Sequence, residues 1–287
     1  MSPDQFTDQT EYATARARVA ETFIQQFRVL RQTLPFMPTI SESVDEADHL
    51  FAAQTAAKLL ELWLRPAEVH DLRVVEQLIQ ASGKDAFSTK IDLRLITEMI
   101  AETGAILQGH FALLSGLHSD FFFMFSKLGT RAEFRRRIAI ELATRFRGAN
   151  IKSVIAPITA GGLLAQDVAD ELKANLAFFD VDDHSRPVAV RRGYSLEGLT
   201  LIVNDVTTTG EGLGRMLKIL AKAGVPSAGI GLIASRGVKG IEIVDELRNN
   251  RNRVEVLFHL AIDAFRLFDC AKCRQGLPYV SSGDINR

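Results

Sequence analysis

The sequence predicts an α/β protein in which a mostly parallel β-sheet is flanked by helices and preceded by a helical N-terminal extension. Two observations support this fold class. Up to about residue 80, apolar residues recur every three or four positions, as on the packed side of a helix. In the second half of the chain, short β-rich runs alternate with helical runs of about 10–15 residues, which indicates βαβ units.

The composition excludes several classes of protein. The 287 residues are 47% hydrophobic and 24% charged, which is ordinary for a globular chain. No apolar run approaches the ~20 residues that span a bilayer, and residues 1–12 lack the features of a secretory signal. The net charge of −1 argues against nucleic acid as a partner. We therefore expect a soluble, cytoplasmic protein that binds neither nucleic acid nor a membrane.

The N-terminal extension is predicted to cover residues 1–85 and to be helical. A first helix ends at Pro35, a second begins near Ser43, and a third runs over residues 66–80. A polar linker over residues 81–90 follows. The extension contains no catalytic constellation, so we expect a packing or oligomerisation role for it.

The second half is predicted to hold a five-stranded, mostly parallel core. The expected strands cover residues 153–158, 176–181, 199–206, 228–235 and 254–260, and the expected helices cover residues 131–147, 162–174, 211–224 and 241–250. Ligands of such sheets bind beyond the carboxyl ends of the strands. This rule points to the turn 157–162 and to the loops after Val181, Val206 and Ser235.

The most informative segment is LIVNDVTTTGEGL, residues 201–213. An apolar strand ends in Asn204 and Asp205, and a turn of three threonines and Gly210 then opens a helix. Hydroxyl groups and free amide groups at a helix N-terminus form a phosphate cradle. The carboxylate just before the turn is suited to sugar hydroxyls or to a metal ion. The segment matches neither a Walker loop nor a dinucleotide fingerprint.

This segment resembles the phosphate loop of the type I phosphoribosyltransferases. Residues 104–123, GAILQGHFALLSGLHSDFFF, resemble the N-terminal signature of orotate phosphoribosyltransferases. Three further stretches continue the resemblance in order, at residues 156–165, 190–198 and 270–278. The resemblance implies a phosphoribosyltransferase-like domain over residues 90–287, with a hood at about 90–130, a core at about 131–265 and a Cys-x-x-Cys tail at 266–287.

The resemblance implies a Mg²⁺-dependent glycosyltransferase of pyrimidine biosynthesis, which transfers ribose 5-phosphate from phosphoribosyl pyrophosphate (PRPP) to orotate or a related carboxylated base. It also implies a cytoplasmic homodimer with small-molecule substrates and a mobile loop at residues 182–192. The implied catalytic residues are Asp205 and Arg192, with Asp205 also an indirect metal contact. The implied PRPP-binding residues are Asn204, Thr207, Thr208, Thr209, Gly210, Ala160 and Gly161, and the implied base-binding residues are Phe111, Ser115, Phe122, Phe123 and Arg236.

Two departures from the family pattern leave alternatives open. Asn204 stands where the family has the first of two adjacent acids, and the acidic run 180–183 stands where it has a basic pair or an acid–Arg–acid run. His184, Arg186, Arg191 and Arg192 are candidates for the missing cations. The chain could instead be a catalytically degenerate binding or regulatory protein, or a transferase for a different acceptor base.

The resemblance assigns no role in metal binding or catalysis to four other residues that are capable of it. Cys270 and Cys273 could ligate zinc, but a structural site needs four ligands and His259 is the only third candidate nearby in sequence, so a structural tail is preferred. His110 and His118 flank the aromatic signature. They are interpreted as shaping the base pocket, with general acid–base catalysis as the alternative.

Overall fold

The computed structural model describes residues 65–81, 92–113, 115–159, 161–183, 185–281 and 285. Residues 66–287 form one compact unit. The first two predicted helices, Ala160, His184 and nearly all of the predicted linker lie outside the described residues. Among the helices that are described, none combines the length and apolar character that crossing a bilayer would require.

A seven-stranded sheet forms the centre of this unit, in the order β2-β10-β9-β8-β5-β6-β7. The five inner strands are parallel, as predicted, and β2 and β7 add an antiparallel strand at each edge. The strands are β2 (Ile79–Ala81), β5 (Ser153–Pro157), β6 (Asn175–Val181), β7 (Pro187–Val190), β8 (Thr200–Thr207), β9 (Ser227–Arg236) and β10 (Val254–Leu260).

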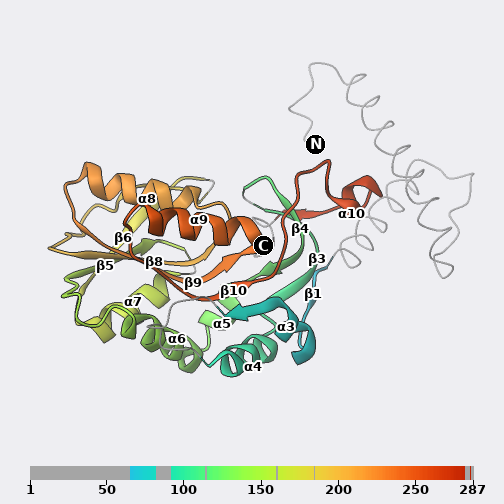
Figure 1. Cartoon of the computed structure of the whole chain (residues 1–287), viewed down its shortest axis with the longest axis horizontal. Helices are drawn as coiled ribbons and strands as arrows, with labels where there is room; N and C mark the ends of the chain where they lie inside the picture. Colours follow the sequence, from blue (N-terminus) through green and yellow to red (C-terminus); the bar gives the residue numbers. More distant parts are fainter. Residues whose placement is uncertain are drawn as a thin grey trace, which may run out of the picture. The chain divides into compact units, whose positions relative to one another are not determined.

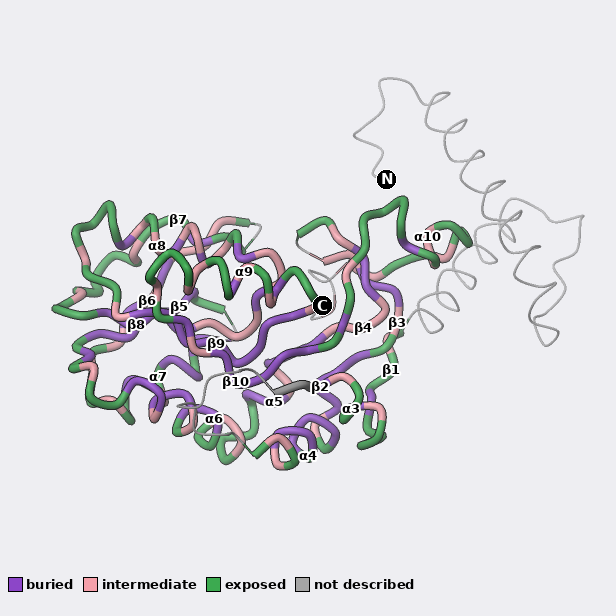
Figure 2. The backbone as a smooth tube through the Cα atoms, in the orientation of Figure 1, coloured by how far each residue is buried: buried purple, intermediate pink, exposed green. Residues whose placement is uncertain are grey.

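Helices cover both faces of the sheet (Figure 1). One face carries α6 (Ala132–Thr144) and α7 (Gly162–Leu172), and the other carries α8 (Glu211–Lys222) and α9 (Gly237–Asn249). Each face has its own apolar cluster, because strands buried on both sides present alternate side chains to opposite layers. The inner strands accordingly appear buried along much of their length (Figure 2).

A second, smaller sheet lies beside the main one (Figure 1). Its central strand β3 (Ile106–Ala112) pairs with β1 (Ala67–Glu68), β4 (His118–Phe123) and β11 (Val280–Ser281). The remaining helices of the described residues are α3 (Leu72–Leu78), α4 (Leu93–Thr103), α5 (Phe125–Gly129) and α10 (Ala271–Arg274). The predicted hood therefore contains the β3–β4 hairpin, and the C-terminal tail is part of its sheet.

The prediction of a helix over residues 66–80 is wrong at both ends of that range. Only α3 is helical there, with Asp71 as its N-cap, while β1 pairs with β3 and β2 pairs with β10. The apolar spacing was correct for α3, but tertiary pairing with the two sheets decides the conformation of the flanking residues. Residues 66–81 thus belong to the compact unit, although the predicted N-terminal extension included them.

Gly231 in the middle of β9 allows α6 to pack closely on the sheet. A Cβ atom there would lie 3.1 Å from Cδ2 of the fully buried Leu142. We expect Gly231→Ala to reduce the free energy of unfolding by about 1–3 kcal/mol through overpacking. Urea denaturation of Gly231→Ala, Leu142→Ala and the double variant measures the coupling. The double variant should lose less than the sum of the two single losses, and strict additivity would contradict the packing argument.

Candidate active site

The carboxyl ends of β5, β8 and β9 open onto a cavity of about 510 Å³. This is the edge at which parallel sheets bind ligands. Its lining includes most of the residues predicted from sequence: Ser115, Phe122, Phe123, Asn204, Asp205, Thr207, Thr208, Thr209, Gly210 and Arg236. Segments that are far apart in the sequence therefore meet around one pocket.

The threonine turn joins β8 to α8 at this pocket. Gly210 is the N-cap of α8 with a φ of 70°, and no side chain of the described residues caps the helix there. The first amide groups of a helix have no intrahelical acceptor, so they and the hydroxyls of Thr208 and Thr209 are available to an anion. The turn therefore has the local structure of a phosphate cradle, as the sequence predicts.

Asp205 lies between this cradle and the turn before α7. Its Oδ1 accepts a hydrogen bond from the backbone N–H of Val206 at 2.8 Å. Burial raises the pKa of the Asp205 carboxyl, and the backbone hydrogen bonds partly oppose this shift. A Cβ at Gly161 would lie 3.6 Å from the amide nitrogen of Asp205, so the two predicted segments are in contact range.

Asn204 uses its side-chain amide locally. Its Nδ2 donates to the carbonyl oxygen of Val206 at 3.3 Å, while the residue lines the pocket. An amide supplies a hydrogen-bond donor and acceptor at this position but no charge. Asp205 is consequently the carboxylate that the end of β8 contributes to the pocket.

Arg236 places a buried cation at the end of β9. Its side chain is only 4% exposed, and Nη2 donates to Ser119 Oγ and, at 2.6 Å, to the carbonyl oxygen of Phe121. Burial lowers the pKa of Arg236 to about 10, so the guanidinium remains charged at neutral pH. Its Nε has no hydrogen-bond partner among the described residues, and no carboxylate there forms an ion pair with it.

The hood contributes aromatic groups to the pocket. Phe122 and Phe123 of β4 line it, together with the exposed Ser115 of the β3–β4 connection. Phe111, also predicted to contact the base, is instead fully buried in the hood and does not line the cavity. Its ring lies 5.6 Å from that of Phe122, because its position in β3 points it into the apolar cluster of the small sheet. Phe111 therefore supports Phe122.

The acidic run at the end of β6 is compensated by nearby arginines. Arg186 pairs with Asp182 at 2.7 Å, and Arg191 pairs with Asp180 at 2.9 Å. Arg186 also lines the pocket, whereas Arg192, predicted to be catalytic, is exposed and does not line it. Part of the segment predicted to be mobile forms strand β7, which pairs with β6. Residues 185–187 of the same segment line the pocket of their own chain.

Sequence reasoning missed two residues that organise this site. Arg215 lines the pocket and pairs with Glu211 at 2.7 Å, which lowers the pKa of that carboxyl. The spacing of four residues on α8 was the available signal. Ser119 is fully buried, donates to the carbonyl oxygen of Asp263 at 2.7 Å and accepts from Arg236. Asp263 and Arg236 are more than a hundred residues away from it in sequence, so no local pattern could have revealed this role.

The two histidines of the aromatic signature lie elsewhere in the hood. His110 and His118 are buried and do not line the pocket, so the structure does not support base-pocket shaping by direct contact. They lie beside Cys270 and Cys273 instead. His259, the third zinc ligand considered from sequence, contacts Ser235 Oγ through Nδ1 and is not part of this group.

No family model matches the chain. The curated orotate phosphoribosyltransferase of Pelotomaculum thermopropionicum is 30% identical over 190 residues, which cover 66% of this chain and 95% of that relative. The chain belongs to the orotate phosphoribosyltransferase family of type I phosphoribosyltransferases. The enzyme of that name from Desulforamulus reducens is 29% identical over 190 residues, with the same coverage.

Solved structures of phosphoribosyltransferases are also similar to this family member. The crystal structure of orotate phosphoribosyltransferase from Aeropyrum pernix covers 56% of this chain and 91% of its own, with 24% identity and a TM-score of 0.46. A phosphoribosyltransferase from Corynebacterium diphtheriae has 16% identity, coverage of 56% and 90%, and a TM-score of 0.46.

Gly210 is required by the conformation of the cradle. In addition to its positive φ, a Cβ there would overlap the side chain of Ile243 on α9. We expect Gly210→Ala to lower the free energy of unfolding by about 1–3 kcal/mol, measured by urea denaturation. Gly214→Ala is the matched control on α8, because nothing lies within 4 Å of a Cβ there. That variant should be neutral or more stable, and equal losses in both variants would refute the argument.

Asp205 is expected to make stability depend on pH. Burial raises its pKa in the folded protein above the ordinary value of an aspartate, so the folded state binds more protons and stability falls as pH rises through this window. Asp205→Asn should therefore be more stable than wild type at neutral pH, with the difference vanishing near the unfolded pKa. Urea unfolding between about pH 4 and 8 measures this. The exposed Asp170→Asn is the control, and a pH-independent difference for Asp205→Asn would contradict the assignment.

Proposed function

We propose that this chain transfers ribose 5-phosphate from PRPP to orotate or a related carboxylated base, with release of pyrophosphate. The observation that carries the proposal is Arg236, a buried guanidinium without a carboxylate partner among the described residues, in the same pocket as a phosphate cradle. A buried cation is costly unless it is paired. The carboxylate of a base would supply the missing partner, and a guanidinium can bind it through two parallel hydrogen bonds.

The cradle at the start of α8 is suited to the 5-phosphate of PRPP. Thr207, Thr208, Thr209 and Gly210 form one wall of the pocket, and the amide groups of the helix N-terminus favour a negative ligand. Asp205 would accept hydrogen bonds from the ribose hydroxyls. Gly161, in contact range of Asp205, and Ala160 would offer backbone N–H groups to the pyrophosphate.

We propose Mg²⁺ as the cofactor. Mg²⁺ prefers oxygen ligands and commonly binds through one or two carboxylates together with substrate phosphates. Asp205 is a pocket carboxylate of this kind, and Asn204 beside it offers a neutral oxygen, so the donor set fits the ion. When bound, Mg²⁺ would neutralise charge on the departing pyrophosphate.

The chain's own contribution to the transfer is mainly positional and electrostatic. The C1–O bond of PRPP breaks and pyrophosphate leaves with the electron pair, while a ring nitrogen of the base forms the new bond to C1 and releases its proton to solvent. Arg236 would hold the base by its carboxylate, and the aromatic wall of Phe122 and Phe123 would contact its ring face. Arg186 and Arg215 also line the pocket and offer positive charge to the phosphates.

The family resemblance supports further parts of this proposal. We place the chain in pyrimidine nucleotide synthesis as a cytoplasmic homodimer. In such a dimer the segment around Arg192 would act at the partner's site, which is compatible with its exposed position in one chain.

A second candidate function is PRPP or nucleotide binding without transfer. Asn204 removes one negative charge from the end of β8, and the cations Arg186 and Arg191 are engaged by Asp182 and Asp180. Both features weaken the electrostatic stabilisation that the reaction needs. Transfer to a different acceptor base is a third candidate, because the contacts to the ring itself are apolar.

Pyrophosphate release with PRPP, Mg²⁺ and orotate tests the proposal. We expect turnover by wild type and a loss of about 10²-fold or more in kcat/KM for Arg236→Ala and for Asp205→Ala, since each removes a contact to reacting groups. For Arg236→Ala we expect the loss to fall mainly on orotate, with PRPP binding measured by calorimetry retained. Arg94→Ala, an exposed change on α4, is the control and should keep full activity.

Three other outcomes would contradict this function in different ways. PRPP binding without turnover selects the non-catalytic alternative. Turnover with another base but not with orotate selects a different acceptor. Full orotate activity in Arg236→Ala would remove the role assigned to that guanidinium.

A further inference from the structure

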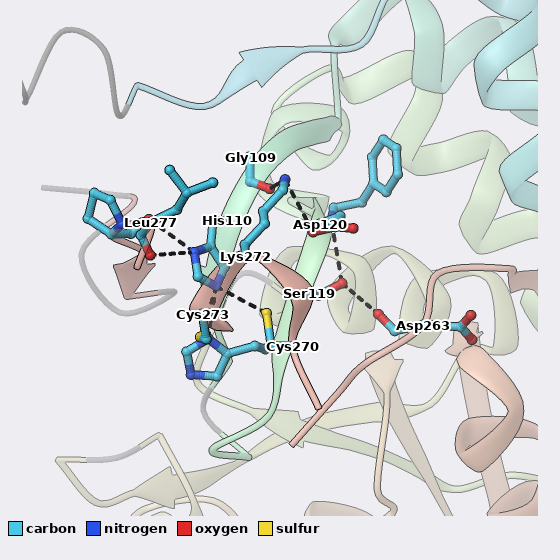
Figure 3. A network of polar contacts seen from close by, with 12 residues as sticks. Gly109, His110, Ser119, Asp120, Asp263, Cys270, Lys272, Cys273 and Leu277 are labelled. Atoms are coloured by element: carbon cyan, nitrogen blue, oxygen red, sulfur yellow. Dashed lines mark hydrogen bonds and ion pairs between the residues drawn. The ribbon is translucent and has the colours of Figure 1, made fainter. Parts of the chain in front are cut away.

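Four potential metal ligands converge in the hood, outside the pocket described above. They are His110 of β3, His118 of β4, and Cys270 and Cys273 at α10, and their ligand atoms all lie within 4.8 Å of one another. The segments come together because Phe265 pairs with His118 through two backbone hydrogen bonds and thereby brings the tail alongside the hairpin. Lys272 reaches across to the carbonyl oxygen of Gly109 and to Asp120 (Figure 3).

The individual distances match a four-ligand arrangement. Nε2 of His110 lies 3.1 Å from Nδ1 of His118 and 3.4 Å from the sulfur atoms of both Cys270 and Cys273. The Cys273 sulfur lies 3.3 Å from His118 Nδ1. A tetrahedral zinc ion bound by two sulfurs and two nitrogens separates these atoms by about 3.3–3.8 Å, given the usual bond lengths. These four distances fall at or just below this range, and all the ligand atoms lie within 4.8 Å of one another, so small shifts of the side chains would place all four on one ion.

Hydrogen bonding alone does not account for this cluster. Nδ1 of His110 faces the carbonyl oxygens of Leu277 and Pro278 at 3.1 and 3.0 Å, and both oxygens can only accept. The ring proton of neutral His110 therefore lies on Nδ1, which leaves a single lone pair on Nε2. That lone pair faces three heteroatoms at once. The lone pair could accept a hydrogen bond from only one of these three atoms, whereas a central cation could bind all four ligand atoms.

The surroundings are those of a closed structural site. Cys270, His118 and His110 are 1%, 4% and 7% exposed. The backbone carbonyls behind His110 hold its ring in the orientation that aims Nε2 at the cluster (Figure 3), as the outer partners of metal-bound histidines usually do. Four protein ligands leave no open position for a substrate, and two thiolates with two imidazoles favour zinc among the common metals.

We propose that His110, His118, Cys270 and Cys273 form a structural Zn²⁺ site that fastens the C-terminal tail to the β3–β4 hairpin. The same hairpin carries Phe122 and Phe123 of the pocket and the Ser119 that holds Arg236. The ion would therefore stabilise the hood without touching a substrate. This proposal does not depend on the function proposed above.

Metal content and cobalt spectroscopy of the full chain test the site. Protein purified without chelators should contain one zinc per chain by mass spectrometry of the elements. After removal of zinc under reducing conditions, added Co²⁺ should give the visible bands of a tetrahedral site and a thiolate-to-cobalt charge-transfer band. The chain has only two cysteines, so that band would come from this pair.

Variants assign the ligands. Cys273→Ser and His118→Asn should bind less than a tenth of the wild-type zinc. His70→Asn changes a histidine that pairs with Glu68 and is not part of the cluster, and it should bind zinc as wild type does. Because a ligand variant could fail to fold, the cobalt titration of wild type decides independently. Reduced, folded wild type that gives no tetrahedral cobalt spectrum would overturn the proposal, as would a Cys270–Cys273 disulfide in freshly purified protein.

Discussion

The buried guanidinium of Arg236 is the interaction on which the candidate site depends. It stands at the carboxyl end of β9 and donates to Ser119 and to the carbonyl of Phe121, both on β4. These bonds fix the hood against the main sheet, so the aromatic wall and the phosphate cradle face the same cavity. They satisfy only part of the guanidinium, because Nε stays without a partner among the described residues. The bonds that position the hood thus leave a cation available to a ligand.

The other cations of the pocket, Arg186 and Arg215, are paired with carboxylates, and this gives Arg236 its distinct role. Arg186 is held by Asp182, and Arg215 is held by Glu211. These pairs are partly exposed, so each contributes little to stability and can exchange its carboxylate for an anionic ligand at low cost. Arg236 is desolvated, as the direction of its pKa shift indicates. Bulk water would therefore screen the attraction between Arg236 and a neighbouring anion far less than it screens the attraction within the exposed ion pairs.

The sequence predicted the main sheet well and the hood poorly, for a physical reason. Buried parallel strands such as β8 and β9 are continuous apolar runs. Because their carboxyl ends lie at the same edge of the sheet, Asp205 and Arg236 are brought to that edge. The hood depends on pairings between distant segments. The two-residue strands β1 and β11 have no pattern of their own and exist because β3 offers them an edge. For the same reason the partners of Cys270 could not be identified by proximity in sequence, which suggested His259 in place of His110 and His118.

Asn204 shows how the site could function with a single acid at the end of β8. Burial already raises the pKa of Asp205, so its ionised form is held with difficulty. A second carboxylate at position 204 would repel the first, and the pair would share a proton over part of the pH range. The amide of Asn204 adds no such repulsion and is anchored to the carbonyl of Val206, whose N–H supports Asp205. The chain therefore has one negative charge fewer at the end of β8 and, in return, keeps the remaining carboxylate easier to ionise.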